Sequence, residues 1–145
     1  LNTVIRQIAF FEFEKNIHEN RKIKELSIEE ICSIWIKVQK QSLGPSIKFD
    51  DEYKYYWTYI PHFIHSPFYV YAYAFGDCLV NSLYAVYEDG LKDFDLKYIK
   101  LLESGGSKNY KDLLKPFNLN PSRPDFWSKG LKVIESFINQ IEDIK

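Results

Sequence analysis

One stretch of the sequence, residues 62–76, combines side chains capable of chemistry with a run that is otherwise apolar and uncharged. It carries two imidazoles and three phenols, those of His62, His65, Tyr69, Tyr71 and Tyr73. A buried histidine nitrogen or tyrosine hydroxyl needs a hydrogen-bond partner. One interpretation is that backbone carbonyls and waters satisfy these groups inside an aromatic core. The other is that several of them point into a cleft, where they donate hydrogen bonds to the oxygen of a bound substrate.

The residues around this stretch predict an extended approach followed by a long helix. Pro61 restricts the preceding residue to an extended conformation, so His62 is expected in a non-helical segment. Pro67 is a good residue for starting a helix, and the following apolar run predicts one helix over residues 68–88. The sequence thus places a histidine just before a tyrosine-rich helix.

The three phenols cannot all point the same way on such a helix. Tyr69 and Tyr73 are four residues apart and share a face, whereas Tyr71 faces differently. Taken without further information, core packing is the more common role for any one of these tyrosines. The functional interpretation therefore needs support from elsewhere in the sequence.

That support is a family resemblance. The segments IPHF at residues 60–63 and PFYVYAYAFG at residues 67–76 closely resemble the C-terminal part of the oligoendopeptidase F family, zinc metallopeptidases similar to thimet oligopeptidase. The resemblance extends over nearly the whole chain. Its other segments are RQIAF at 6–10, FE at 13–14, HE at 18–19, GG at 105–106, PF at 116–117, FW at 126–127 and GL at 130–131.

The resemblance implies that the zinc site lies outside this chain. Enzymes of the family bind zinc through two histidines of a His-Glu-x-x-His helix and a downstream glutamate, and the glutamate inside the motif is the general base. Here His18 and Glu19 are followed by Lys22, where the second histidine would fall. We expect a C-terminal fragment of the catalytic domain that begins after the zinc ligands. The complete enzyme would need zinc, and this chain would supply no ligand to it.

The resemblance also implies roles for individual residues. In the family, a histidine and one or two tyrosines of this segment bind the substrate carbonyl and stabilise the oxyanion formed when zinc-bound water attacks. His62 matches by its Pro-His-Phe context, and Tyr71 and Tyr69 are expected to act with it as catalytic residues. Tyr73 and His65 are expected to bind substrate, and a structural role is open for His65.

The remaining sequence predicts helices and contains no strand pattern of useful length. Predicted helices cover residues 3–19, 28–42, 68–88, 95–103 and 110–114, with a short one from residue 50 and a last one from residue 124. Ser27 and Glu30 match a capping box. The last helix is expected to bury one apolar stripe, formed by Phe126, Trp127, Leu131, Ile134, Phe137, Ile138 and Ile141. The predicted fold class is all-α, with about six or seven helices in a single helical region over residues 1–145. It resembles the C-terminal portion of a zincin-type oligopeptidase catalytic domain.

Composition argues against nucleic acid and membranes as partners and is consistent with a reducing compartment. A net charge of −1 gives no basic field for nucleic acid, and no apolar run reaches the roughly 18 residues that would span a membrane. Cys32 and Cys78 are expected to be buried free thiols, consistent with a reducing cytoplasm. Glu14 and His18 have metal-ligand spacing, but an ordinary helix contact is the favoured interpretation.

Three functional hypotheses follow. The first is a zinc-dependent oligoendopeptidase for short peptides, in which this chain supplies a His/Tyr wall and partners the missing upstream part of the catalytic domain. The second is a non-catalytic peptide-binding remnant. The third is a helical interaction domain whose exposed aromatic surface docks the missing half.

Overall fold

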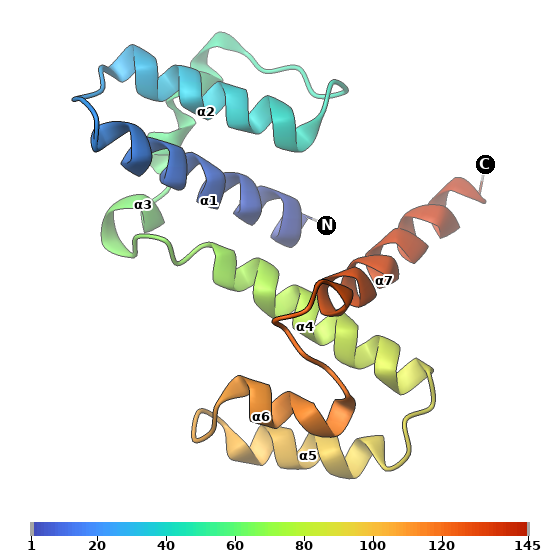
Figure 1. Cartoon of the computed structure of the whole chain (residues 1–145). Helices are drawn as coiled ribbons and strands as arrows, with labels where there is room; N and C mark the ends of the chain where they lie inside the picture. The colour runs from blue at the N-terminus through green and yellow to red at the C-terminus, as the bar shows by residue number, and fades with distance from the viewer. Residues whose placement is uncertain (1, 145) are drawn as a thin grey trace. The chain divides into compact units, whose positions relative to one another are not determined.

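The structure is a computed structural model that describes residues 2–144, and within them it is all-helical with no strand (Figure 1). This confirms the predicted fold class. The α-helices are α1 (Asn2–Arg21), α2 (Ile28–Leu43), α3 (His62–His65), α4 (Tyr71–Glu88), α5 (Phe94–Ser104), α6 (Tyr110–Leu114) and α7 (Pro124–Glu142). Two 3-10 helices, η1 (Asp51–Tyr59) and η2 (Lys115–Phe117), complete the set. The chain divides into two compact units, with the boundary between Phe75 and Gly76 inside α4.

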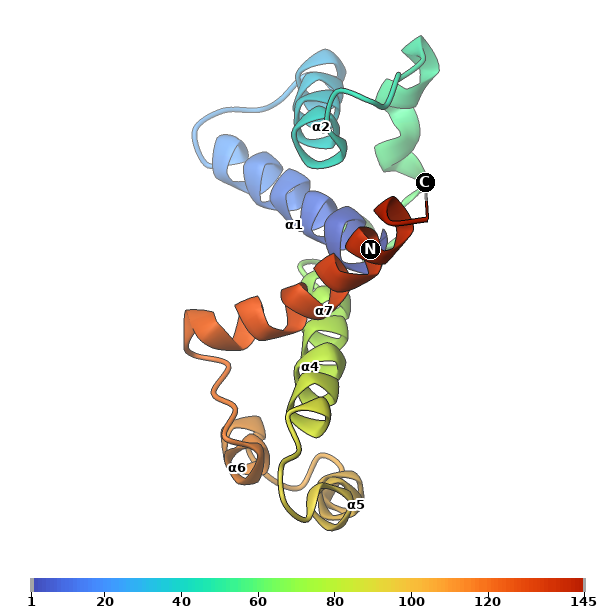
Figure 2. The same ribbon diagram turned by 90° about the vertical axis from the view of Figure 1, so that its right-hand side faces the viewer.

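The first unit is built around α1 and α2, which pack side by side (Figures 1 and 2). The predicted capping box is present, because Ser27 Oγ accepts from Glu30 N at 3.2 Å and Glu30 Oε2 accepts from Ser27 N at 2.9 Å. The centre of the core is Trp35, which is 1% exposed. Its ring centroid lies 5.1 Å from that of Phe13 and 5.6 Å from that of Phe10.

The same tryptophan ties η1 to the helical pair. Its indole Nε1 donates to the backbone oxygen of Tyr53 at 3.0 Å, so the only polar atom of the buried ring is satisfied. Phe63 of α3 packs on Trp35 with ring centroids 6.4 Å apart and on Phe13 with centroids 5.1 Å apart. The core therefore fixes α3, and with it His62, against α1 and α2.

The second unit has its own core, formed by Leu83, Val86, Leu114, Phe117, Leu119 and Phe126. Helix α4 meets α7 at Gly130, and Ser82 Oγ donates to the backbone oxygen of Phe126 at 3.0 Å beside this crossing. Gly130 is buried. A glycine is required there because the two backbones approach too closely for a side chain between them.

Replacing Gly130 by alanine is expected to lower the free energy of unfolding by about 1–3 kcal/mol. The added Cβ would lie 2.6 Å from the backbone oxygen of Cys78 and 2.9 Å from Ser82 Oγ. Urea denaturation followed by circular dichroism measures the change. Gly76→Ala is the matched control, because its Cβ would meet nothing within 4 Å and Gly76 is likewise a helical glycine, in α4. That substitution should be neutral or stabilise the helix by up to ~1 kcal/mol. Equal stability of the Gly130 variant and the unaltered chain would contradict the close crossing.

Two local predictions are corrected by the structure. His62 does not lie in a non-helical segment but begins α3, because Pro61 itself adopts helical angles (φ −65°, ψ −23°) and starts that helix. The long helix begins at Tyr71 and not at residue 68, because Phe68 has a positive φ of 58° that interrupts helical geometry. The short helix predicted from residue 50 is present, as the 3-10 helix η1.

The predicted buried stripe of α7 is also only partly correct. Phe126 is buried and Trp127 packs against the second core, but the later members of the stripe are open. Those exposed are Leu131 (45%), Phe137 (50%), Ile138 (38%) and Ile141 (66%). Helical periodicity identifies an apolar face, whereas burial needs a partner element that covers it, and these side chains of α7 remain largely uncovered.

Between residues 2 and 144, no helix is both long and apolar enough to cross a membrane.

Candidate functional site

The structure brings together three of the five residues singled out in the sequence. His62, Tyr69 and Tyr73, called here the His62 cluster, form a set of mutually packed rings. The His62 ring is parallel to that of Tyr69 (centroids 6.2 Å apart, 5° between planes) and perpendicular to that of Tyr73 (6.0 Å, 84°). The two phenol rings pack edge to face at 5.6 Å. Tyr73 Oη lies 3.4 Å from His62 Nε2.

Short local turns bring Tyr69 and Tyr73 back to His62, although they lie 7 and 11 residues further along the chain. The backbone N–H of Tyr69 donates to the oxygen of Ser66, and that of Tyr73 donates to the oxygen of Val70. Val70 is fully buried, with no exposed surface, and belongs to the core of the first unit. The chain therefore turns back after α3 while anchored by Val70, so the residues on either side of the turn face each other.

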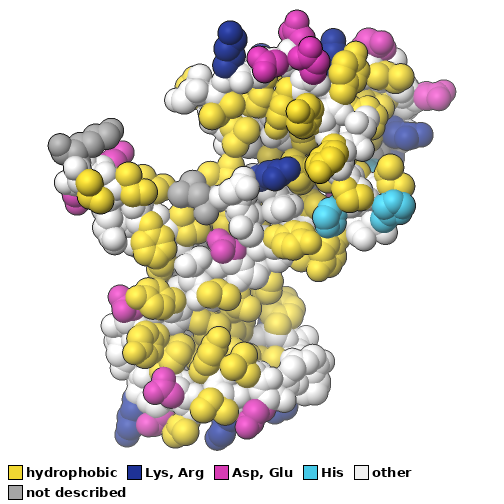
Figure 3. Space-filling model, turned by 180° about the vertical axis from the view of Figure 1, so that it is seen from behind, with side chains coloured by type: hydrophobic (Ala, Val, Ile, Leu, Met, Phe, Trp, Pro, Cys, Tyr) yellow, Lys and Arg dark blue, Asp and Glu magenta, His cyan; other side chains and the backbone are white. Residues whose placement is uncertain are grey.

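The His62 cluster is open to solvent. Tyr69 is 52% exposed and Tyr73 is 40% exposed, while His62 is half-buried. Figure 3 shows histidine side chains at the surface of the molecule beside hydrophobic ones. These two tyrosines are therefore not sequestered core residues.

Tyr71 and His65 are placed differently. Tyr71 is 54% exposed and packs edge to face on Phe11, with centroids 5.9 Å apart. His65 is exposed at the last position of α3. The structure thus places Tyr73, rather than Tyr71, beside the imidazole of His62, as expected from two tyrosines that face different ways.

A buried carboxylate anchors the turn that leads to Tyr69. Glu14 of α1 is 3% exposed, and its Oε1 accepts from the backbone N–H of Phe68 at 2.8 Å. A left-handed conformation costs a non-glycine residue such as Phe68 about 1–2 kcal/mol. A hydrogen bond to a charged group contributes about 1.5–3 kcal/mol, so this bond offsets the backbone cost. The sequence suggested only an ordinary helix contact between Glu14 and His18, and the bond to Phe68 was missed because it joins residues 54 positions apart.

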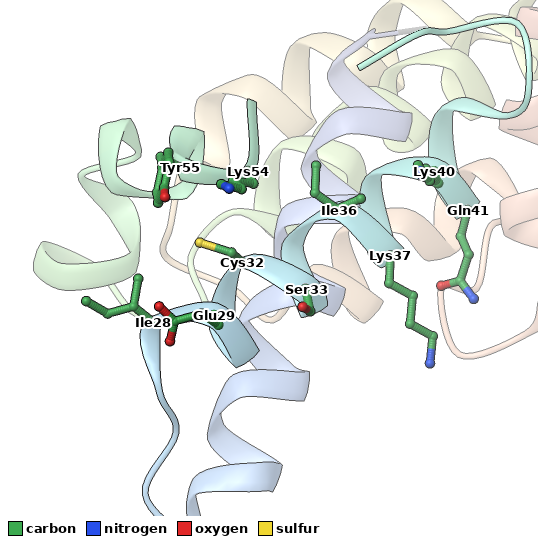
Figure 4. Close-up of a pocket in the computed structure, with 10 residues that line it drawn as sticks. All are labelled: Ile28, Glu29, Cys32, Ser33, Ile36, Lys37, Lys40, Gln41, Lys54 and Tyr55. Atoms are coloured by element: carbon green, nitrogen blue, oxygen red, sulfur yellow. The ribbon is translucent and has the colours of Figure 1, made fainter. Parts of the chain in front are cut away.

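The first unit has at least two pockets. One of about 670 Å³ is lined by α2 and η1 residues that include Cys32, Lys40 and Lys54 (Figure 4). No residue of the His62 cluster lines it. The other, of about 350 Å³, is lined by residues of α1, η1 and α3, with Glu14 and Phe63 among them. The cluster is therefore a surface feature and lines neither of these two cavities.

The described residues do not form a metal centre. From residue 2 to residue 144, no three His, Cys, Asp or Glu side chains gather into a group that could hold a metal ion. Cys32 and Cys78 are buried and free, as predicted. Burial raises the pKa of the Cys78 thiol, which disfavours the thiolate needed for ligation or nucleophilic attack. Glu14 and His18 have metal-ligand spacing, but the carboxylate of Glu14 accepts a hydrogen bond from the backbone N–H of Phe68.

Comparison with known proteins gives matches over almost the whole chain. Residues 2–133 match peptidase family M3. An oligoendopeptidase F homologue of Borreliella burgdorferi is 37% identical over 150 aligned positions, which cover 100% of this chain and 24% of that protein. The oligopeptidase PepF of Bacillus subtilis is 30% identical (98% and 21% covered), and the chromosomal oligoendopeptidase F of Lactococcus lactis subsp. cremoris is 29% identical (98% and 24%). The chain spans about a quarter of the length of these relatives. No solved structure matches it significantly.

Proposed function

The chain belongs to peptidase family M3, and from this premise we propose that it is part of a zinc-dependent oligoendopeptidase that hydrolyses short peptides. The named relatives are about four times as long as the chain. In this proposal the rest of the catalytic domain, with the metal ligands, lies in the part of the longer protein that this chain does not contain. The proposed setting is the cytoplasm.

The proposed role of this chain is to bind the carbonyl oxygen of the scissile peptide bond. That oxygen gains negative charge when the carbonyl carbon becomes tetrahedral, and hydrogen-bond donors aimed at it stabilise the transition state. The observation that carries the proposal is the 3.4 Å separation of Tyr73 Oη and His62 Nε2. An oxygen can therefore lie at the ordinary hydrogen-bond distance of about 2.8 Å from both atoms at once.

This geometry sets a requirement on protons. His62 must carry a proton on Nε2, and the Tyr73 hydroxyl must turn from the imidazole to the substrate oxygen. The parallel ring of Tyr69 holds the imidazole from one side, and its own hydroxyl is available as a further donor. Tyr71 and His65 are proposed to contact the substrate beyond the reacting bond.

Residues 2–144 contain no group of three His, Cys, Asp or Glu side chains that could hold zinc. The contribution that we propose for this chain is to bind and orient the substrate carbonyl and to donate hydrogen bonds to it.

Turnover by a chimeric peptidase tests the role of His62. In this chimera the present chain replaces the matching quarter of the Borreliella burgdorferi relative. His62→Phe keeps an aromatic ring against Tyr69 but removes both ring nitrogens, so kcat for a short internally quenched peptide should fall about 10²–10³-fold. Tyr59→Phe, at a side chain that is 79% exposed, is the control and should leave kcat unchanged. Unaltered turnover in His62→Phe and in the phenylalanine variants of Tyr69, Tyr71 and Tyr73 alike would exclude the proposed role.

A docking role is a second candidate, favoured by the exposed apolar side chains of α7. Phe137 and Ile141 are 50% and 66% exposed, and such surfaces in soluble proteins mark interfaces. The chain on its own should therefore self-associate in sedimentation velocity experiments, and Phe137→Glu with Ile141→Lys should restore the monomer. A chain that is monomeric at all concentrations without these substitutions would count against this role.

A further inference from the structure

We propose that Glu14 is a positioning residue for the His62 cluster: its carboxylate holds the backbone of Phe68 in the turn that places Tyr69 against His62. This inference rests on the proposed function of the cluster and extends it to a residue on another helix. Glu14 touches neither His62 nor the phenols in this scheme, and it acts through the main chain.

The first argument is the burial of Glu14. Its side chain is 3% exposed, although burying a carboxylate is unfavourable unless hydrogen bonds compensate. One of its oxygens accepts from Phe68 N at 2.8 Å. Among the residues that the structure describes, the other oxygen, Oε2, has no hydrogen-bond partner. A carboxylate kept in such surroundings is poorly explained by stability alone, because an apolar side chain would fill the site without the desolvation cost.

The second argument is the conformation of the residue that Glu14 holds. Phe68 has a φ of 58°, a region that residues other than glycine and asparagine seldom adopt. Such conformations persist only where the surroundings impose them, and they concentrate at functional sites. The hydrogen bond from Phe68 N to the carboxylate is a direct constraint on this peptide unit.

The third argument is that one face of α1 contacts both the backbone and the side chain of Phe68. Phe11, Glu14 and His18 recur at steps of three and four residues and so lie on the same face. The ring centroid of Phe68 lies 6.1 Å from that of Phe11 and 4.9 Å from that of His18. The carboxylate fixes the backbone of Phe68 while these two rings fix its side chain.

Glu14 is connected to the His62 cluster through only two consecutive residues, Phe68 and Tyr69. Tyr69 follows Phe68 directly, so the ψ angle of Phe68 and the peptide plane after it set the direction in which the Tyr69 ring leaves the chain. That ring is the parallel partner of His62 and the edge-to-face partner of Tyr73. A rotation at Phe68 would therefore separate the stacked rings, although every member of the cluster would still be present.

Nuclear magnetic resonance of the 145-residue chain tests the geometry. The flanking phenol rings shift the Hδ2 and Hε1 resonances of His62 by ring currents. Glu14→Ala should move both resonances towards random-coil values, and Glu14→Gln should retain them, because its amide oxygen still accepts from Phe68 N. Gln39→Ala is the control for general loss of stability, since Gln39 is 1% exposed and bonds with Tyr53 rather than with Phe68. Native His62 resonances in Glu14→Ala would overturn the proposal.

A rescue experiment isolates the backbone effect. Glycine adopts a positive φ without steric cost, so Phe68→Gly added to Glu14→Ala should return the His62 resonances towards native values. Phe68→Ala added to Glu14→Ala removes the same ring but keeps an L-residue, and it should not restore them. If Glu14→Ala alone does not fold, folding of the glycine double variant but not of the alanine one supports the proposal. Failure of both, or equal recovery in both, contradicts it.

Activity of the chimeric peptidase separates this inference from the proposed function. Glu14→Ala should lower kcat by about 10²-fold through misplacement of the donors, with Glu14→Gln close to wild type. If His62→Phe leaves kcat unchanged, the function of the cluster is wrong, while the resonance shifts still report whether Glu14 positions it. If His62→Phe lowers kcat but Glu14→Ala changes neither kcat nor the resonances, only the positioning role is excluded.

Discussion

Removing the hydroxyl of Tyr73 is expected to lower kcat of the chimeric peptidase about 10²–10³-fold, which is the usual loss when one oxyanion donor is deleted. Tyr73→Phe keeps the ring that packs edge to face on Tyr69 and His62, so the cluster should remain assembled. The only group lost is Oη, which lies 3.4 Å from His62 Nε2. Because ground-state binding uses many other contacts, KM should change much less than kcat.

Two matched variants test whether the loss of kcat is specific to the hydroxyl of Tyr73. Tyr71→Phe removes a hydroxyl from a ring that packs on Phe11 instead of His62, and its effect on kcat should be smaller. Tyr84→Phe removes an exposed hydroxyl from the same helix, α4, and should have no effect. A loss in Tyr71→Phe that exceeds the loss in Tyr73→Phe would return the donor role to Tyr71, the tyrosine that the sequence resemblance favours.

Truncating Trp35 is expected to produce the largest loss of stability in the first unit. Trp→Ala in a core typically costs about 3–5 kcal/mol, from lost burial and from the cavity left behind. Trp35 is 1% exposed, contacts the rings of Phe10, Phe13 and Phe63, and donates its indole N–H to Tyr53. Since whole domains have only about 5–15 kcal/mol of stability, this one change should bring the unit close to unfolding.

Guanidinium denaturation followed by tryptophan fluorescence and circular dichroism measures the effect. Tyr59→Ala is the control, because this large aromatic residue is 79% exposed and its removal should change the free energy of unfolding by no more than about 0.5 kcal/mol. Trp35→Phe should lie between the two, since it keeps an aromatic ring but loses the hydrogen bond to Tyr53. A cost below 1 kcal/mol for Trp35→Ala would contradict the central place of this residue.

The helix boundaries show where local rules succeed. The start of α2 is encoded by Ser27 and Glu30, whose side chains satisfy each other's backbone N–H groups within four residues. Its end follows from Gly44, which adopts a φ of 75°. Such signals act within one turn of chain, so the sequence alone suffices to predict them.

The start of α4 shows where local rules fail. Pro67 predicts a helix from Phe68, but the backbone N–H of Phe68 is bound by Glu14, a residue 54 positions away. This contact requires α1 and the turn to be packed together, and no local pattern reports it. The same limitation explains the exposed half of α7, whose apolar face is evident from periodicity while its burial depends on a partner.

The sequence by itself determined that this protein is all-α, where most of its helices lie and which family it resembles, and it predicted a site at His62 and the neighbouring tyrosines. These properties depend on residue type and on spacing along one element. Only the tertiary structure decided that Tyr73 and Tyr69, rather than Tyr71, meet His62, and that Glu14 is buried beneath the turn between them. Those contacts depend on how separate segments pack, because a positive φ at one residue redirects every side chain that follows it.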